Sequence, residues 1–135
     1  MSETPKVITA GQQTVAARLF VYGTLRAGRG NHFLLNGAQY LGVRHTQPKF
    51  TMVSCGGFPG VLGSGDTSIV GEVYEVTNPD QLRQIDRLEG HPDWYTRTPI
   101  TTIEGDEVEI YLYPEQTATQ RQLPIIASGD WARRD

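Results

Sequence analysis

Glu89 is the residue of this sequence whose type and position best suit acid–base chemistry. The pattern of residues 79–89 predicts a helix with an apolar stripe of Leu82, Ile85 and Leu88. At about 100° per residue, Glu89 lies roughly 20° from Leu82 and roughly 40° from Ile85, so its carboxyl falls on the face that meets the core. Burial, the helix C-terminus and the neighbouring Asp86 all favour the protonated acid. We therefore expect a raised pKa, in the range that a general acid and base needs.

Two other interpretations of Glu89 stay open: the side chain turns out into solvent, or it pairs with Arg97. Tyr95 and Arg97 flank one residue of a segment that enters a strand, so their side chains should point to the same side. Both could stack on a polar ligand or hydrogen-bond to it. Tyr95 and its neighbour Trp94 could equally close the end of the core, which is the commoner role of aromatic residues.

A second candidate is the glycine-rich loop that follows the uncharged run at residues 19–21, a predicted buried strand. Residues 22–31 contain three glycines and two arginines: Gly23, Arg26, Gly28, Arg29 and Gly30. Glycine lets a backbone approach a ligand and aim N–H groups at it, and the arginines would suit an anion. An ordinary strand and turn with two solvated arginines is the alternative. A nucleotide-binding P-loop is disfavoured because no Gly-Lys-Ser/Thr follows.

Other chemistries find little support. The three histidines and Cys55 show no spacing typical of a zinc site, and no Gly-x-Ser-x-Gly nucleophile motif is present. Cys55 has no paired histidine motif, so we interpret it as a structural thiol. We expect neither a metal ion nor a cofactor.

The elements that must position these residues are mostly short strands. Alternation and turn residues predict strands over residues 19–21, 38–46, 49–54, 68–76, 96–103 and 108–113. Tyr40, Leu41 and Val43 should face inward, and Gly71 should mark a bulge or a close approach of chains. Gly105 and Asp106 form the turn of the last hairpin.

Helical signals are fewer. Asn78 can cap a helix that has Pro79 in its first position, and Gln81 has the spacing of a capping box, while Gly90 can end that helix. Residues 31–35 read as one or two helical turns closed by Gly37, and the polar residues 115–119 read as a loop. Together these elements predict an α+β fold built on a curled or barrel-like mixed sheet.

Composition places the chain among ordinary globular proteins. Its 135 residues suit one domain, and we expect a flexible tail over residues 1–17, a single domain over 18–131 and a frayed end over 132–135. A net charge of −3 argues against nucleic-acid binding. The absence of a long apolar run and of a secretion signal, together with the single cysteine, predicts a cytoplasmic protein without membrane contact. The oligomeric state is not determined, and a monomer is the default.

Four groups of residues form a combined motif along the chain. They are Val21-Tyr22-Gly23-Thr24-Leu25, Gly28 with Asn31-His32, Ile85-Asp86-Arg87-Leu88-Glu89-Gly90, and Tyr95-Thr96-Arg97. In this order they resemble the gamma-glutamylcyclotransferase-like family, which includes gamma-glutamylaminecyclotransferase and the AIG2-like proteins. The resemblance spans roughly residues 19–113, and Ser128-Gly129-Asp130-Trp131 is similar to the end of bacterial members.

This resemblance implies a small mixed β-barrel with a few helices packed outside it. Tyr22, Gly23, Thr24 and Leu25 would bind the α-carboxylate end of a γ-glutamyl group, largely through backbone amides, with Tyr95 as a further substrate-binding residue. Glu89 would be the acid and base. The implied reaction cyclises a small γ-glutamyl amine or γ-glutamyl dipeptide to 5-oxoproline and releases the amine, without metal or cofactor.

The sequence leaves two alternatives to this activity. One is a non-catalytic module that binds a small anion or metabolite on the same fold, since a fold does not fix a function. The other is a different amide-cleaving or acyl-transfer enzyme that would release free glutamate. No long insertion that would wall off a large substrate is present, so no particular substrate is implied.

Overall fold

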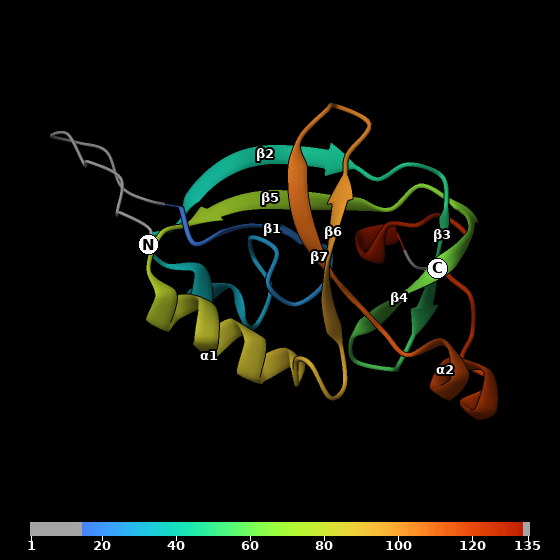
Figure 1. The fold of residues 1–135 in the computed structure, drawn as a ribbon. Helices are drawn as coiled ribbons and strands as arrows, with labels where there is room; N and C mark the ends of the chain where they lie inside the picture. Colours follow the sequence, from blue (N-terminus) through green and yellow to red (C-terminus); the bar gives the residue numbers. More distant parts are fainter. Residues whose placement is uncertain (1–14, 134–135) are drawn as a thin grey trace, which may run out of the picture.

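Strand β1 (Ala17–Val21) lies at the centre of a five-stranded mixed sheet, as expected from its apolar run (Figure 1). The computed structural model describes residues 15–133 of the chain. The strand order is β2-β5-β1-β7-β6, with β1 antiparallel to β5 and parallel to β7. A separate two-stranded sheet pairs β3 with β4.

The other elements confirm most of the predicted order. The remaining strands are β2 (Gln39–His45), β3 (Phe50–Ser54), β4 (Pro59–Thr67), β5 (Val70–Val76), β6 (Thr96–Thr101) and β7 (Glu107–Leu112). The helices are α1 (Pro79–Glu89) and α2 (Glu115–Arg121), and the 3₁₀ turns are η1 (His32–Leu35) and η2 (Trp131–Arg133). The predicted α+β class is therefore confirmed.

The predicted barrel is wrong, because the sheet does not close. Its edge strands are β2 and β6, and in the described part of the chain an isolated bridge between Thr46 and Thr102, not a ladder, joins the segments beyond their ends. The β3–β4 hairpin meets β7 where the Tyr113 N–H donates to the Val61 carbonyl at 2.8 Å. Closure would need a continuous ladder at these places, and single contacts leave the sheet open.

Two apolar clusters pack on the two faces of β1. Leu19 and Val21 point into the cluster that includes Ile85 of α1, whereas Phe20 points into the cluster that includes Met52 of β3. Successive side chains of a strand alternate between faces, so a central strand that is apolar throughout is buried on both. This arrangement fixes the end of β1 between α1 on one side and the β3–β4 hairpin on the other (Figure 1).

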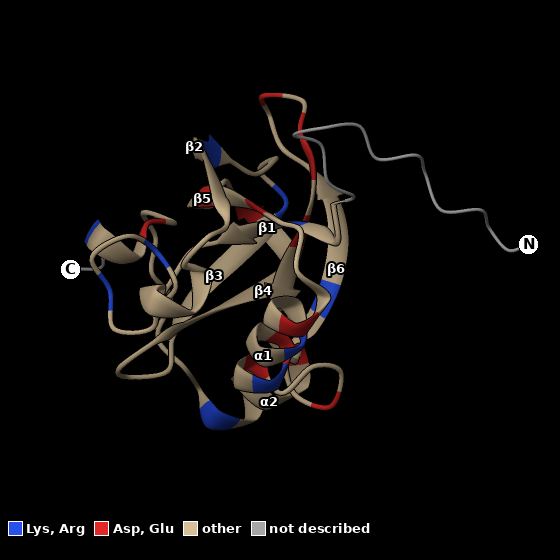
Figure 2. Cartoon of the chain, turned by 90° about the vertical axis from the view of Figure 1, so that its left-hand side faces the viewer, with Lys and Arg blue, Asp and Glu red and all other residues tan. Residues whose placement is uncertain are grey.

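Helix α1 begins and ends as its sequence predicts. The Asn78 side chain accepts from the N–H groups of Asp80 and Gln81, and Gly90 takes a left-handed conformation with φ of 71°. The Gln81 amide does not complete a capping box, because it donates instead to the carbonyls of Leu34 and Asn36 and so ties α1 to η1. Both signs of charge are mixed along α1 (Figure 2).

Two local expectations fail for tertiary reasons. Tyr40 and Val43 are exposed, because β2 is an edge strand whose register shifts between Tyr40 and Gly42. Residues 115–119 lie within α2 and not in a loop, and the burial of Ala118 against the core accounts for that helix.

The expected ends of the chain fall partly outside the described residues, namely residues 1–14 of the N-terminal tail and residues 134–135 of the C-terminus. Among residues 15–133, no helix is long and apolar enough to cross a membrane. The segment after α2 returns to the domain, where Ile126 and Trp131 are buried.

Gly71 provides a test of the packing around β1. A Cβ at this position would lie 2.6 Å from the Phe20 ring and 2.7 Å from the Val21 carbonyl oxygen, as expected for a close approach of chains. Gly71→Ala should therefore lower the free energy of unfolding by about 1–3 kcal/mol, measured by urea denaturation. Gly30→Ala is the control, since no atom lies within 4 Å of its Cβ position and its stability should stay within about 1 kcal/mol of the parent. Equal stability of the two variants would contradict the packing described here.

Candidate active site

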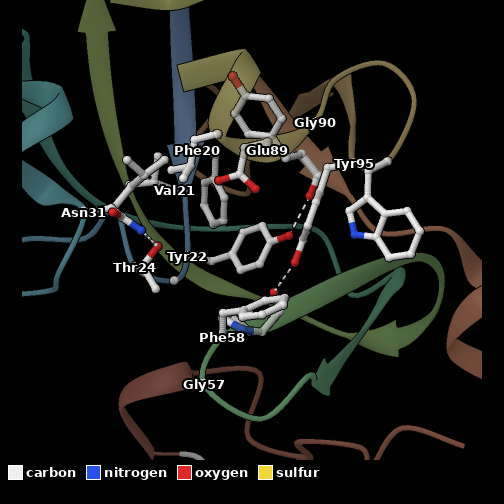
Figure 3. Close-up of a pocket in the computed structure, with 16 residues that line it drawn as sticks. Phe20, Val21, Tyr22, Thr24, Asn31, Gly57, Phe58, Glu89, Gly90 and Tyr95 are labelled. Carbon is white, nitrogen blue, oxygen red and sulfur yellow. Dashed lines mark hydrogen bonds between the residues drawn. The ribbon is translucent and has the colours of Figure 1, made fainter. Parts of the chain in front are cut away.

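A cavity of about 460 Å³ opens where the end of β1, the end of α1 and the turn before β4 meet (Figure 3). This volume lies within the range of about 300–1,000 Å³ that is usual for small-molecule sites. The residues lining it are Phe20, Val21, Tyr22, Gly23, Thr24, Leu25, Asn31, Gly57, Phe58, Pro59, Leu88, Glu89, Gly90, Trp94, Tyr95 and Tyr111. The predicted residues Glu89, Tyr95 and the Tyr22–Leu25 loop are thus brought to one cavity.

Glu89 is the last residue of α1, and its carboxyl points into the cavity toward Phe20 and Tyr22 (Figure 3). No group among the described residues hydrogen-bonds this carboxyl. Burial raises its pKa to about 7, and the negative charge of Asp86 adds to the rise. The predicted direction of the shift and two of its causes, burial and Asp86, are confirmed, while the effect of the helix C-terminus stays a prediction. The side chain is not turned out into bulk solvent.

Arg97 is engaged elsewhere and does not pair with Glu89. Its guanidinium donates to both carboxylate oxygens of Asp86, at 2.9 and 3.1 Å, and to Glu109 at 2.6 Å. The Tyr111 hydroxyl also donates to Asp86, at 2.5 Å. Arg97 does not line the cavity, so the expectation that it could contact a ligand beside Tyr95 is not supported by its position.

The loop after β1 presents three consecutive backbone N–H groups that lack acceptors. Within residues 15–133, the N–H groups of Gly23, Thr24 and Leu25 donate to no protein atom. Their carbonyls are all occupied: they accept from Arg26 N, Asn31 N and His32 Nδ1 respectively. Gly23 and Leu25 are buried, and buried N–H groups almost always have a partner. Free donors with satisfied acceptors define a site for an anionic or carbonyl oxygen.

Contacts on three sides hold this loop in place. A Cβ on Gly23 would lie 2.8 Å from the Pro59 ring, so β4 packs directly against the loop backbone. The Tyr95 hydroxyl donates to the Pro59 carbonyl at 2.8 Å, and the Tyr22 hydroxyl donates to the Tyr111 carbonyl at 2.6 Å. Burial raises the pKa of both phenols, so they stay protonated as donors at neutral pH.

The arginines of the loop do not bring charge to the cavity. Arg26 pairs with Asp130 at 2.9 Å and with Glu72 at 3.4 Å, and Glu72 also accepts from the Ala27 N–H at 2.9 Å. Neither Arg26 nor Arg29 lines the cavity. Arg26 therefore anchors the loop to β5 and the C-terminal segment, and the unpaired N–H groups are what the loop itself offers to an anion.

The outer part of the cavity was not predicted from the sequence. Phe58, Leu88 and Trp94 form its mouth, and Tyr111 forms part of its wall. Leu88 was expected on the core stripe of α1, but its side chain is 43% exposed. The alternation of β7 gives no sign of Tyr111, because Tyr111 lies on the same face of the strand as Glu107 and Glu109, which are exposed and half-buried. The signal available in the sequence was the presence of apolar residues close to Glu89 in the chain, because apolar residues that remain exposed can mark a binding surface.

Metal ligands are not gathered at this site. Among residues 15–133, no group of three or more His, Cys, Asp or Glu side chains is arranged to hold a metal ion. Glu89 is also the only charged residue among those that line the cavity in the described part of the chain.

The chain matches a known protein family. The family model described as "Gamma-glutamyl cyclotransferase, AIG2-like" matches residues 19–133, so the chain belongs to this family. A protein of Vibrio cholerae named "Putative gamma-glutamylcyclotransferase" is 42% identical over 116 residues, which is 86% of this chain and 96% of that protein.

Solved structures agree with this assignment. The solution structure of the protein YtfP from Escherichia coli is similar with a TM-score of 0.67 and 34% identity, over 87% of this chain and 98% of that chain. The crystal structure of an AIG2-like protein from Mus musculus has a TM-score of 0.63 and 32% identity, over 81% of this chain and 84% of that chain.

The raised pKa of Glu89 has a measurable effect on stability. A carboxyl whose pKa is higher in the folded state stabilises the fold below its unfolded value of 4.5, and this stabilisation is lost as the pH rises through about 7. Relative to Glu89→Gln, the parent should therefore lose about 1–3 kcal/mol of unfolding free energy between those two pH values. Urea denaturation across pH 4–8 measures the difference, and a carbon-13 titration of the Glu89 carboxyl should give a midpoint near 7. A midpoint near 4.5 would show that the carboxyl is solvated.

Proposed function

We propose that this protein is a γ-glutamyl cyclotransferase that converts a small γ-glutamyl amide to 5-oxoproline and releases the amine. The observation that carries the proposal is an unpaired carboxyl, with a pKa of about 7, in the same cavity as three unpaired backbone N–H groups. Membership of the family supports the same reaction class. Glu89 is the proposed general acid and base.

The first step needs a base. The substrate's α-ammonium gives a proton to the Glu89 carboxylate, and the free amine then attacks the γ-carbonyl carbon to form a five-membered ring. A pKa of about 7 leaves a large share of Glu89 ionised at neutral pH, while its conjugate acid is strong enough for the second step. The attack is intramolecular, so holding the chain of the γ-glutamyl group in a folded conformation supplies much of the rate.

The second step needs an acid. Protonated Glu89 gives its proton to the nitrogen of the leaving amine, and the bond between that nitrogen and the γ-carbonyl carbon breaks. The ring nitrogen, which carries two protons after the attack, loses one of them to become the lactam N–H, and the leaving amine takes it, so the products are 5-oxoproline and the amine in its ammonium form. Glu89 carries the first of these two protons in and out of its carboxyl and returns to its ionised form, and no water is consumed.

The loop N–H groups complete the site in this proposal. Gly23, Thr24 and Leu25 present donors that suit the α-carboxylate of the γ-glutamyl group, and a spare donor would stabilise the oxyanion that forms on the γ-carbonyl. Tyr22 and Tyr95 shape the cavity wall with their rings, since their hydroxyls are held by backbone carbonyls. Substrate binding by Tyr95 would thus be a ring contact.

A non-catalytic anion-binding module is the second candidate, and the free loop N–H groups favour it equally. It predicts saturable binding of a small carboxylate that survives Glu89→Gln, with no turnover. An amide hydrolase that uses the same carboxyl would release free glutamate in place of its cyclic form.

The proposed reaction predicts that Glu89→Gln abolishes product formation. Loss of a general acid and base should lower kcat by about 10²–10⁴-fold, because the amide side chain cannot carry the proton. Mass spectrometry of 5-oxoproline and glutamate after incubation with a panel of γ-glutamyl amides measures this. For the parent, kcat/KM should rise about tenfold per pH unit below 7 and level off above it, since the base must be ionised.

Glu107→Gln is the matched control for this experiment. Glu107 is exposed on β7 and lies outside the cavity, so the same chemical change there should leave kcat within about twofold of the parent. No 5-oxoproline across the panel, or full activity in Glu89→Gln, would contradict the proposed function.

A further inference from the structure

We propose that the amine released from the substrate carries an uncharged apolar or aromatic group, which binds at the mouth formed by Phe58, Leu88 and Trp94. This inference rests on the proposed function. It concerns the amine half of the substrate, which the γ-glutamyl site does not hold. It predicts that γ-glutamyl amides of neutral aromatic or aliphatic amines are better substrates than γ-glutamyl amino acids.

The mouth of the cavity is apolar and open to solvent. Phe58, Leu88 and Trp94 are 42%, 43% and 42% exposed, and all three line the cavity. They come from separate segments: the turn before β4, the last turn of α1 and the loop before β6. A single exposed apolar side chain needs no explanation, but three that converge on one cavity from distant parts of the chain mark a binding surface.

Trp94 is held in position before any ligand arrives. Its ring packs edge-on against Tyr113, with ring centroids 5.5 Å apart and an interplanar angle of 87°. Its Cβ lies against Gly90, where an added Cβ would come within 2.9 Å of it. An aromatic wall that is already ordered loses little conformational entropy when a ligand binds, which favours stacking of an apolar group.

No cationic side chain among the described residues lines this mouth to pair with a second carboxylate. Among the described residues that line the cavity there is no Lys, Arg or His. Of the arginines on neighbouring elements, Arg26 pairs with Asp130, Arg97 pairs with Asp86 and Glu109, and Arg121 donates to the Tyr113 hydroxyl. None of these lines the cavity, and neither do Arg29 and Arg87. The carboxylate of a γ-glutamyl amino acid would lose water here without gaining an ion pair, and that desolvation is unfavourable.

The distal group of the amine should also lack a positive charge. Glu89 is the only acidic residue of the described lining, and in the proposed reaction it exchanges the proton with the reacting nitrogens. An ammonium at the far end of the amine would lie against the apolar mouth, where no further carboxylate lines the cavity to pair with it. Charge therefore disfavours both kinds of ionised leaving group, whereas apolar contact favours a neutral one.

Three substrates separate these effects. γ-Glutamyl-phenethylamide and γ-glutamyl-phenylalanine share a phenyl ring and differ by one carboxylate, and γ-glutamyl-methylamide has neither group. We expect kcat/KM for the phenethylamide to exceed that for γ-glutamyl-phenylalanine by tenfold or more, and that for the methylamide by about tenfold. Equal values for the phenethylamide and γ-glutamyl-phenylalanine would overturn the proposal.

Two variants test the mouth itself. Trp94→Ala and Leu88→Gln should each lower kcat/KM for the phenethylamide by about five- to tenfold and change it for the methylamide by less than twofold. Phe33→Ala is the control, because Phe33 is 61% exposed and lies outside this cavity. Two variants are used so that the test still holds if one of them misfolds. Circular dichroism checks that each variant is folded. Equal losses on both substrates would show that the mouth does not contact the amine and would overturn the proposal.

A binding measurement keeps this inference separate from the reaction. Calorimetry on Glu89→Gln, which should not turn over, compares the dissociation constants of γ-glutamyl-phenethylamide and γ-glutamyl-phenylalanine. Tenfold tighter binding of the phenethylamide supports the inference even if the parent produces no 5-oxoproline, which would contradict only the proposed function. Equal or reversed affinities, with 5-oxoproline formed from both compounds, would overturn the inference and leave the reaction standing.

Discussion

The site depends on holding one carboxyl in an unfavourable place. Glu89 ends α1, where the helix dipole and the loss of water both oppose its negative charge. Packing of the helix keeps it there: Ile85 is fully buried one turn earlier, and the left-handed Gly90 ends the helix before the chain turns toward Trp94. Packing of the core offsets the free energy that this placement costs. The result is an acid that titrates near neutral pH.

Around this carboxyl, the other charged groups are satisfied by one another. Asp86 is held by Arg97 and the Tyr111 hydroxyl, and on the far side of the loop Glu72 is held by Arg26 together with the Ala27 N–H. Buried polar groups are normally paired, so the unpaired ones stand out. Within the described residues, the Glu89 carboxyl and the N–H groups that follow Tyr22 have no such partner, and all of them belong to residues that line the same cavity.

Local pattern was enough to predict the parts of the site that belong to single elements. The helical period placed Glu89 beside Leu82 and Ile85, and cap residues fixed both ends of α1, because these features depend on a few neighbouring residues. Sequence could not predict the open sheet, the exposed Tyr40 or the role of Leu88 at the cavity mouth. Each of these follows from which strands pair and which loops meet, and such contacts join residues far apart in the chain.

The most direct test of the shared site is a titration of nitrogen-15-labelled protein with 5-oxoproline, the product that the proposed reaction forms. The account predicts that the amide signals of Gly23, Thr24 and Leu25 shift together and saturate, and that the carboxyl titration of Glu89 moves with them. Signals of exposed residues such as Gly105 should stay in place. Saturable shifts confined to residues outside the cavity, or none at high concentration, would contradict the claim that these donors and this acid serve one ligand.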